Sequence, residues 1–323
     1  MSINSFLPVY NLLKMLYSSN MINIPKEFTI PNNAQVIFVS DFWPSDLIGG
    51  AELTLDACAR VCPVPYFKLH AHSLTEQMLK QHRDKIWIFG NQTQINHYLL
   101  NQVITLGIHY YFFEMDFKTC LARSTIKHEL QTKKPCDCHS QLHGQFLSYW
   151  MTNSKTLFWC SDLQREKFYG IYPHLRGKTI DFTQGSTYYP ETILNIRKIR
   201  EKKEAGEIQV LDRWCILQSD SWIKGTDDSI AYCKEHRLNY VLLHNLTNEK
   251  FLEELAISRG YIFMTRDIDV GSRVVSECKL LGGQPIVNDF VLHVKEDWFK
   301  QPIPRIEEYL LDGPARFWRQ IKL

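Results

Sequence analysis

The chain has 323 residues, more than one hydrophobic core usually organises, so two domains are expected. With 45% hydrophobic and 22% charged residues, its composition is that of an ordinary globular protein and excludes a disordered or membrane-embedded chain. The net charge of +2, from 37 basic and 35 acidic residues, lacks the basic excess of a non-specific nucleic-acid binder, so a nucleic-acid partner is not expected.

The N-terminal segment and the cysteines indicate a cytoplasmic protein. The most apolar N-terminal stretch, residues 6–17, is interrupted by Pro8, Asn11 and Lys14. It falls short of the ~20 apolar residues of a membrane span and lacks the basic start and cleavage site of a secretory signal, so no transmembrane segment is expected. The nine cysteines are an odd number and mostly scattered through apolar surroundings, which is typical of free thiols in a reducing compartment.

From residue 34 onward, short apolar runs alternate with longer amphipathic segments, the pattern of βαβ units and a parallel sheet. In the first half, the predicted strands cover residues 35–40, 66–70, 85–89, 108–113, 156–159 and 178–182. The predicted helices between them cover residues 50–60, 74–81, 93–106, 139–152 and 162–169. These elements would form a first Rossmann-like domain over residues 1–190.

A charged segment, residues 191–207, separates the two halves and is interpreted as a solvated helix or linker rather than a nucleic-acid patch. The alternation then restarts, with predicted strands at 214–218, 240–243, 260–264 and 284–287 and predicted helices at 226–236, 248–257 and 272–281. A second domain over residues 208–302 follows from this pattern. The tail, residues 303–323, contains Pro304 and Pro314 and is expected to form a helix that packs back on the first domain.

The loops after the strands are where chemistry is expected, because open α/β sheets bind ligands beyond the carboxyl ends of their strands. After the first predicted strand, Gly49 and Gly50 directly precede a helix, where the exposed backbone and the helix N-terminus favour phosphate. A tight turn alone would explain this pair of glycines equally well. The absence of G-x-G-x-x-G and of a P-loop argues against a dehydrogenase or an NTPase.

The acidic loop of the second domain carries the strongest signal. A strand runs into residues 265–271, and Gly271-Ser272 then opens a helix whose first N–H groups could hold a diphosphate. Asp269 precedes this helix, and Glu277 lies about a turn and a half into it. An ionised carboxylate there can accept hydrogen bonds from two hydroxyls of a ribose or a hexose.

The segment from the acidic loop to the next strand, residues 265–287, resembles the donor-site motif of retaining GT-B glycosyltransferases of the family 4 type. In that motif an acid and a second acid eight positions later lead to a helix-ending glycine and a P-V/I-V strand, as in Gly282–Val287 here. The resemblance assigns Glu277 to the nucleotide ribose and Asp269 to the hydroxyls of the transferred sugar. Family members usually carry Glu at the first position, so Asp269 is a departure. The resemblance implies an α/β fold of GT-B architecture, with two Rossmann-like domains whose parallel sheets face each other across a cleft, and a UDP-, GDP- or ADP-sugar donor.

Three further stretches are similar to motifs of that family. Gly49-Gly50-Ala51-Glu52 resembles the G-G-x-E loop beside the donor diphosphate. Residues 113–123, with Glu114 and Asp116, resemble H-D-Y-W-x-x-C-P-R, but have Glu-Met before Asp where the family has His. Lys224-Gly225 matches the family Lys-Gly pair, whereas Ser219 stands where a diphosphate-binding Arg is usual. Arg266 and Arg273 are candidate substitutes, since a guanidinium suits bidentate phosphate contacts.

The expected catalysis is electrostatic. Lys224, the N–H groups of residues 271–273 and the Gly49–Gly50 loop would stabilise the departing nucleoside diphosphate, so no catalytic metal and no cofactor beyond the donor is expected. Glu52, Glu114, Asp116 and His72 are assigned to the acceptor side, although an ordinary polar loop explains His72 more simply. The acceptor would be a glycan or a lipid-linked saccharide.

Several alternatives remain open. Cys120, Cys136, Cys138 and His139 could supply four zinc ligands, but C-x-C is one residue tighter than a C-x-x-C knuckle, and local packing is the simpler interpretation. The rival functions are a sugar-nucleotide epimerase or hydrolase of the same fold, a catalytically silent sugar-nucleotide-binding module, and transfer onto a nucleic-acid base.

Overall fold

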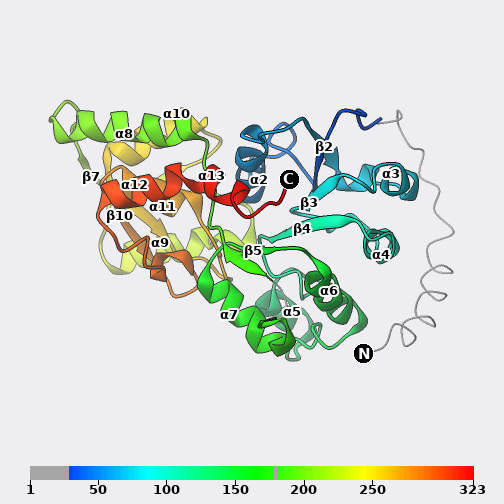
Figure 1. Cartoon of the computed structure of the whole chain (residues 1–323). Coiled ribbons are helices and arrows are strands. Elements are labelled where there is room, and N and C mark those ends of the chain that lie inside the picture. The colour runs from blue at the N-terminus through cyan, green and yellow to red at the C-terminus, as the bar shows by residue number, and fades with distance from the viewer. Residues whose placement is uncertain (1–28, 178–179) are drawn as a thin grey trace.

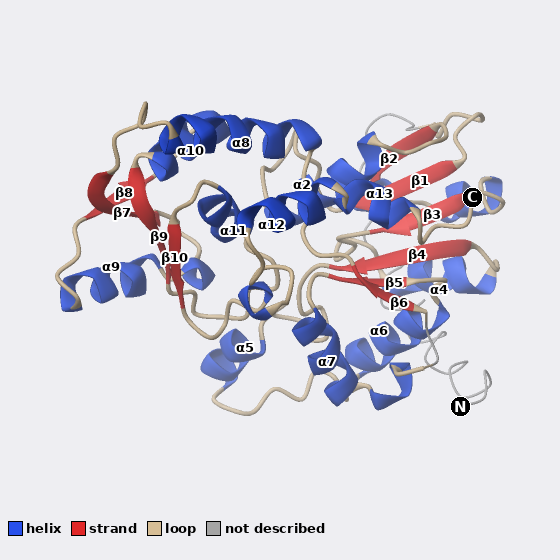
Figure 2. Ribbon diagram, turned by 60° about the vertical axis from the view of Figure 1, so that its left-hand side comes forward, coloured by secondary structure: helices blue, strands red, loops and turns tan. Residues whose placement is uncertain are grey.

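The computed structural model describes residues 29–177 and 180–323, so the apolar stretch 6–17 and the start of the strand expected at 178–182 lie outside the described residues. The strands form two separate parallel sheets (Figure 1), with the orders β2-β1-β3-β4-β5-β6 and β10-β9-β7-β8. Helices flank both sheets, which confirms the predicted α/β class (Figure 2). Within the described ranges, no helix is long and apolar enough to cross a membrane.

The six-stranded sheet comes from the first half of the chain. Its strands are β1 (Val36–Ser40), β2 (Tyr66–His70), β3 (Ile86–Phe89), β4 (His109–Glu114), β5 (Leu157–Trp159) and β6 (Asp181–Thr183). The segments between them contain α2 (Gly50–Arg60), η2 (Ala71–Ser73), α3 (Glu76–Gln81), α4 (His97–Thr105), α5 (Thr125–Thr132), α6 (Leu142–Asn153), α7 (Asp162–Ile171) and η3 (Pro173–Leu175). Every residue of β1 is buried, as is typical of an inner strand of a parallel sheet covered on both faces.

Two differences from the predicted elements have local causes. α4 begins at His97, four residues later than expected, because the Asn96 side chain caps it by accepting from the Leu99 backbone N–H at 2.9 Å. α5 is absent from the prediction because it buries none of its residues and so leaves no apolar pattern in the sequence.

The four-stranded sheet consists of β7 (Leu211–Leu217), β8 (Tyr240–Leu243), β9 (Ser258–Phe263) and β10 (Gln284–Val287). Its helices are α8 (Pro190–Glu204), η4 (Trp222–Lys224), α9 (Thr226–Glu235), α10 (Asn248–Ala256), α11 (Arg273–Leu280) and η5 (His293–Lys295). The charged segment thus forms α8, which packs against α10, α11 and α12 (Ile303–Leu311) and buries Ile193 and Ile196.

The tail forms two helices rather than one, α12 and α13 (Gly313–Trp318), with Pro314 in the first turn of α13. α13 packs against α2 of the first half (Figure 1). The Trp318 indole donates to the Cys58 carbonyl at 2.8 Å, and the Phe317 ring lies 4.7 Å from that of Phe158. The chain therefore crosses back from the second sheet to the core of the first.

Each sheet has one point where the strand order reverses, which is called its switch point below. β1 pairs with β2 on one side and β3 on the other, and β7 pairs with β8 on one side and β9 on the other. Loops that leave adjacent strands in opposite directions at such a point leave room for a ligand. The loop with Gly49 and Gly50 follows β1, that with Lys224 follows β7, and that with Asp269 follows β9. All three loops therefore start at switch points.

Candidate functional site

The end of η4 holds Lys224 against the end of β9. Gly225 has a φ of +58°, and a Cβ there would overlap the carbonyl oxygen of Met264, so only glycine fits. The Ile223 carbonyl accepts from the Arg266 backbone N–H at 2.9 Å and from Thr265 Oγ1 at 2.7 Å. These contacts fix the backbone on both sides of Lys224, whose Nζ lies 3.5 Å from Asp269 Oδ2.

Asp269 is held by its own backbone at the start of the turn that leads to α11. Its N–H donates to the Phe290 carbonyl, and its carbonyl accepts from Leu292 N–H, both at 2.9 Å. Its Oδ1 accepts from Gly271 N–H at 3.1 Å. Ser272 precedes α11 without capping it through its side chain, so the first N–H groups of the helix carry the positive end of its dipole.

Glu277 is a buried acid on α11 that the protein leaves without a hydrogen-bond partner. Glu277 is 4% exposed, and no hydrogen bond or ion pair within residues 29–177 and 180–323 reaches its carboxylate. Burial raises the pKa of Glu277, against the opposing effect of Arg273. Since no donor among the described residues occupies this carboxylate, its two oxygens are available to hydrogen-bond donors that a ligand brings.

The loops of the two halves meet at their glycines. A Cβ on Gly50 would lie 3.7 Å from Arg273 Cδ. A Cβ on Gly271 would lie 2.7 Å from Ser186 Oγ, which donates to the Gly271 carbonyl at 2.8 Å. The glycine loop after β1 and the acidic loop after β9 are therefore neighbours. Lys224 lies beside the same two loops because it contacts Asp269 of the acidic loop.

The two candidate substitute cations are already engaged by the protein. Arg266 forms an ion pair with Asp228. The Arg273 guanidinium lies 3.8 Å from the centre of the Tyr188 ring and donates to the Thr187 carbonyl. Lys224 is 38% exposed and only loosely paired, which makes it the least constrained of the three cations.

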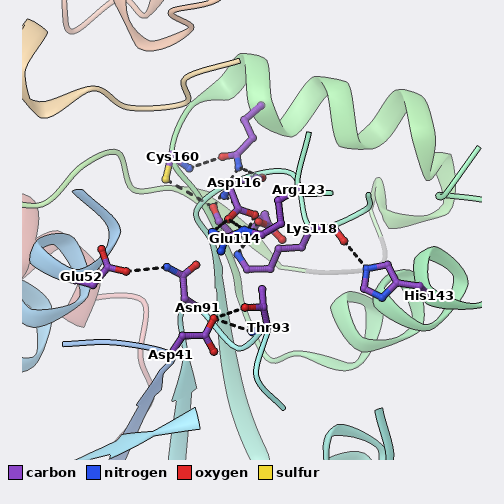
Figure 3. Close-up of polar contacts among 11 residues, drawn as sticks. Asp41, Glu52, Asn91, Thr93, Glu114, Asp116, Lys118, Arg123, His143 and Cys160 are labelled. Atoms are coloured by element: carbon purple, nitrogen blue, oxygen red, sulfur yellow. Dashed lines mark hydrogen bonds and ion pairs between the residues drawn. The ribbon is translucent and has the colours of Figure 1, made fainter. Parts of the chain in front are cut away.

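On the first sheet, Glu52 and Asp41 organise the switch point (Figure 3). Glu52 is buried, accepts from Asn91 Nδ2 at 3.3 Å, and lies so close to Gly49 that a Cβ there would overlap its carboxylate. Asp41, which directly follows β1, accepts from the backbone N–H groups of Thr93 and Gln94, both at 3.0 Å. Asp41 was not among the predicted site residues, although an acid directly after a buried strand is a recognisable signal.

A partly buried charge cluster lies at the end of β4 (Figure 3). Lys118 Nζ lies 2.9 Å from Glu114 Oε1 and 3.4 Å from Asp116 Oδ1, and Arg123 pairs with Asp116. Burial, opposed by Lys118, raises the pKa of Glu114 to about 7. Burial would also raise the pKa of Asp116, but Lys118 and Arg123 outweigh it and the pKa is lowered. The structure thus brings the predicted Glu114 and Asp116 together and adds two cations to them.

This charge cluster adjoins both a cavity and the acidic loop. Lys118, Arg123 and His143 help to line a cavity of about 410 Å³. On the other side, Cys160 Sγ lies 3.7 Å from the Glu114 carbonyl, and its Cβ would lie 3.8 Å from a Cβ on Gly271. Lys118 and Arg123 had no predicted role, although two cations within seven residues of Asp116 indicate ion pairing.

Two other predicted features lie elsewhere. His72 is exposed beyond the edge strand β2, its ring 5.4 Å from that of His70, and β1 and β3 separate β2 from β4. Cys120, Cys136 and Cys138 gather around His128, whereas His139, the fourth ligand considered from the sequence, is not among them.

No family model matches the chain, and no curated protein matches it. Solved structures do. HepE from Anabaena in complex with UDP has 10% identity and a TM-score of 0.53, over 88% of this chain and 91% of that chain. An E. coli trehalose-6-phosphate structure bound with UDP-2-fluoro glucose has 10% identity and a TM-score of 0.50, over 88% and 96%. A UDP-forming trehalose-phosphate synthase from Burkholderia xenovorans has 9% identity and a TM-score of 0.45, over 77% and 74%. At such identities the likeness shows the fold alone, and the first two structures confirm the predicted GT-B architecture.

Proposed function

We propose that the chain is a glycosyltransferase that moves a sugar from a nucleoside-diphosphate donor to an acceptor, with retention of configuration and without a catalytic metal. The observation that carries this proposal is Glu277, an unpartnered buried carboxylate on a helix whose uncapped N-terminus adjoins Lys224, Asp269 and the Gly49–Gly50 loop. A nucleotide sugar offers the complementary groups: paired ribose hydroxyls for the acid and a diphosphate for the helix end and the lysine.

Each group would have a separate task. Glu277 binds the ribose hydroxyls, and Asp269 binds a hydroxyl of the transferred sugar after Lys224 turns from it to the diphosphate. The N–H groups of residues 271–273 and the Gly49–Gly50 loop face the same diphosphate. In the oxocarbenium-like transition state, negative charge grows on the departing nucleoside diphosphate, and these fixed dipoles and Lys224 stabilise it there.

The acceptor would enter from the first sheet, beside Glu114 and Asp116. The cavity lined by Lys118 and Arg123 offers charged and polar groups suited to a glycan or the saccharide of a lipid-linked acceptor. UDP-sugars are the first donors to test, since the structures of similar fold from Anabaena and E. coli hold UDP and UDP-2-fluoro glucose. The nine unpaired cysteines support the expected reducing, cytoplasmic compartment.

A catalytically silent sugar-nucleotide-binding module is the second candidate. The observation that favours it is the engagement of both arginines: Arg266 by Asp228 and Arg273 by Thr187 and Tyr188. With Ser219 in the place of the usual Arg, Lys224 would stabilise the leaving group as the single side-chain cation.

The test is to incubate the protein with UDP-, GDP- and ADP-sugars, with and without EDTA and with mixed glycan acceptors, and to measure nucleoside-diphosphate release and glycosylated product. Turnover that survives EDTA and falls in Lys224→Ala supports the proposal. Lys234→Ala, an exposed lysine on α9, should leave turnover unchanged. Binding without turnover would favour the silent module, and no binding of any sugar nucleotide would overturn both candidates.

A further inference from the structure

A cluster of three cysteines and one histidine lies outside the donor groups, in the segment between β4 and α6. The ligand atoms of Cys120, His128, Cys136 and Cys138 all lie within 4.8 Å of one another, and the cluster is partly to fully buried. His128 Nδ1 is 3.1 Å from the sulfur of Cys136, 3.2 Å from that of Cys138 and 3.6 Å from that of Cys120. Three sulfurs thus converge on one imidazole nitrogen.

Hydrogen bonding does not account for this convergence. An imidazole Nδ1 carries either one hydrogen or one lone pair, so it can make one good hydrogen bond, not three. A disulfide would join two of the cysteines and would leave the position of the third cysteine and of the histidine unexplained. None of the three cysteines is disulfide-bonded. One cation coordinated by all four atoms would give each of them a partner.

The geometry fits zinc. Tetrahedral coordination with Zn–S near 2.3 Å and Zn–N near 2.0 Å places sulfurs about 3.8 Å apart and sulfur and nitrogen about 3.5 Å apart. The three sulfur–nitrogen distances bracket that value. The sulfurs lie within 4.8 Å of one another, so closing the shell brings them together by up to about 1 Å. Thiolate and imidazole are also the ligands that zinc prefers.

The helix that carries His128 has little else to hold it. α5 has eight residues and buries none of them, so apolar packing contributes little, and a helix of this length is marginal alone. Its two ends are set locally: Ser124 caps the first turn by accepting from Lys127 N–H at 2.8 Å, and Lys133 follows the last turn with a φ of +58°. A cross-link through His128 would tie the helix to the loops before and after it.

We propose that Cys120, His128, Cys136 and Cys138 bind one zinc ion as a structural site. Four protein ligands leave no open position for substrate, so the ion does not take part in sugar transfer. It braces the segment that follows the charge cluster: Cys120 lies between Lys118 and Arg123, and all three help to line the cavity of about 410 Å³. On the other side, a Cβ on Gly144 would overlap the Cys138 carbonyl, so the Cys138 loop is seated directly on α6.

The test begins with metal analysis of the full chain, purified without chelator under reducing conditions. We expect about one zinc ion per chain, the stoichiometry of a closed four-ligand site. His128→Ala and Cys136→Ser should reduce the zinc content several-fold. His139→Ala is the matched control, because His139 is the neighbour of Cys138 but lies outside the cluster, and its zinc content should be unchanged.

A second measurement covers the case in which the variants fail to fold. Zinc is removed from the wild-type chain with a thiol-specific mercurial, the thiols are regenerated, and cobalt(II) is added. The visible bands of tetrahedral cobalt–thiolate, lost again on adding zinc, support the proposal. Zinc far below one equivalent together with no cobalt bands, a disulfide among the three cysteines in the purified chain, or equal zinc loss in His139→Ala would overturn it.

Discussion

The carboxylates at the two switch points of the molecule differ in how many protein partners they have. At the first switch point and the end of β4, each of four acids has a protein partner for at least one of its oxygens: backbone N–H groups for Asp41, Asn91 for Glu52, Lys118 for Glu114 and Arg123 for Asp116. At the second switch point, Asp269 has only Lys224 at 3.5 Å beside the turn N–H of Gly271, and Glu277 has no hydrogen-bond partner within the described ranges.

Under the proposed function, this contrast separates acids that stabilise the fold from acids that bind the donor. A buried acid paired with a cation is costly to disturb, because removal of either partner leaves an uncompensated charge. A buried acid without a partner already carries that cost, so its neutralisation should not weaken the fold. The same kind of substitution should therefore give opposite results at the two switch points.

The largest expected effect is on stability at the first switch point. Lys118→Met leaves Glu114 buried without its cation, and loss of one partner of a buried pair costs about 3–5 kcal/mol. Denaturant unfolding of the full chain measures this loss. Lys127→Met, an exposed lysine on α5, should change stability little, and Lys118→Met with Glu114→Gln should recover part of the loss. A loss as small as that of Lys127→Met would show that the pair does not hold the fold.

The next effect concerns the backbone beneath Lys224. Gly225→Ala places a Cβ on the Met264 carbonyl and forces alanine to a φ of +58°. The left-handed conformation costs roughly 1–2 kcal/mol and the forced shift roughly 1–3 kcal/mol more, with Lys224 displaced. Gly206→Ala is the control, since its φ is +78° but no atom lies within 4 Å of the added Cβ. Equal losses of unfolding free energy in the two variants would contradict the steric argument.

At the second switch point the expected effect is on binding alone. Under the proposed function, Glu277→Gln weakens the charged hydrogen bonds proposed for the ribose. Such bonds contribute about 1.5–3 kcal/mol, so nucleoside-diphosphate affinity should fall by about 10–100-fold. Titration calorimetry with UDP measures this, with the exposed Glu253→Gln as control. Because burial raises the pKa of Glu277, the neutral side chain should leave the unfolding free energy unchanged or higher. A variant that binds normally but unfolds more easily would mark Glu277 as structural.

The sequence was sufficient for the fold and for the positions of the loops that are predicted to bind the donor. Parallel sheets leave alternating apolar runs and amphipathic helices, so 66–70, 240–243 and 284–287 match β2, β8 and β10 to the residue. Gly49–Gly50 and Asp269 lie where strand order predicts a ligand, because the motif and the switch point are both properties of loops after strands.

What the sequence could not supply depends on side chains far apart in the chain or on helices without an apolar face. Arg273 and Arg266 were indistinguishable as phosphate cations until Tyr188 and Asp228 were seen beside them. The sequence-based set of ligands contained His139 in place of His128. Because α5 has no hydrophobic pattern, the sequence did not indicate the helix that brings His128 to Cys136. Such pairings are set by tertiary contacts rather than by local spacing.

The last prediction concerns a slope with pH and not a loss at one pH, and it involves Glu296, the carboxylate that joins the two regions. Its Oε1 accepts from the N–H groups of Asp162 at 2.9 Å and Leu163 at 3.5 Å, at the start of α7. Burial and the nearby Asp162 raise the pKa of Glu296 from 4.5 to about 7. Between these two pH values the folded chain holds a proton that the unfolded chain releases, so the contribution of Glu296 to stability falls as pH rises through this window.

Glu296→Gln keeps the acceptor oxygen but cannot titrate, so it should flatten the pH dependence of unfolding free energy between pH 4.5 and 7, by the slope of at most one proton. Glu308→Gln, an exposed acid on α12, should keep the slope of the wild type. If both variants follow the wild-type profile, Glu296 does not titrate in this range. The contrast between acids with and without protein partners would then apply to the two switch points alone and not to the contact between the halves.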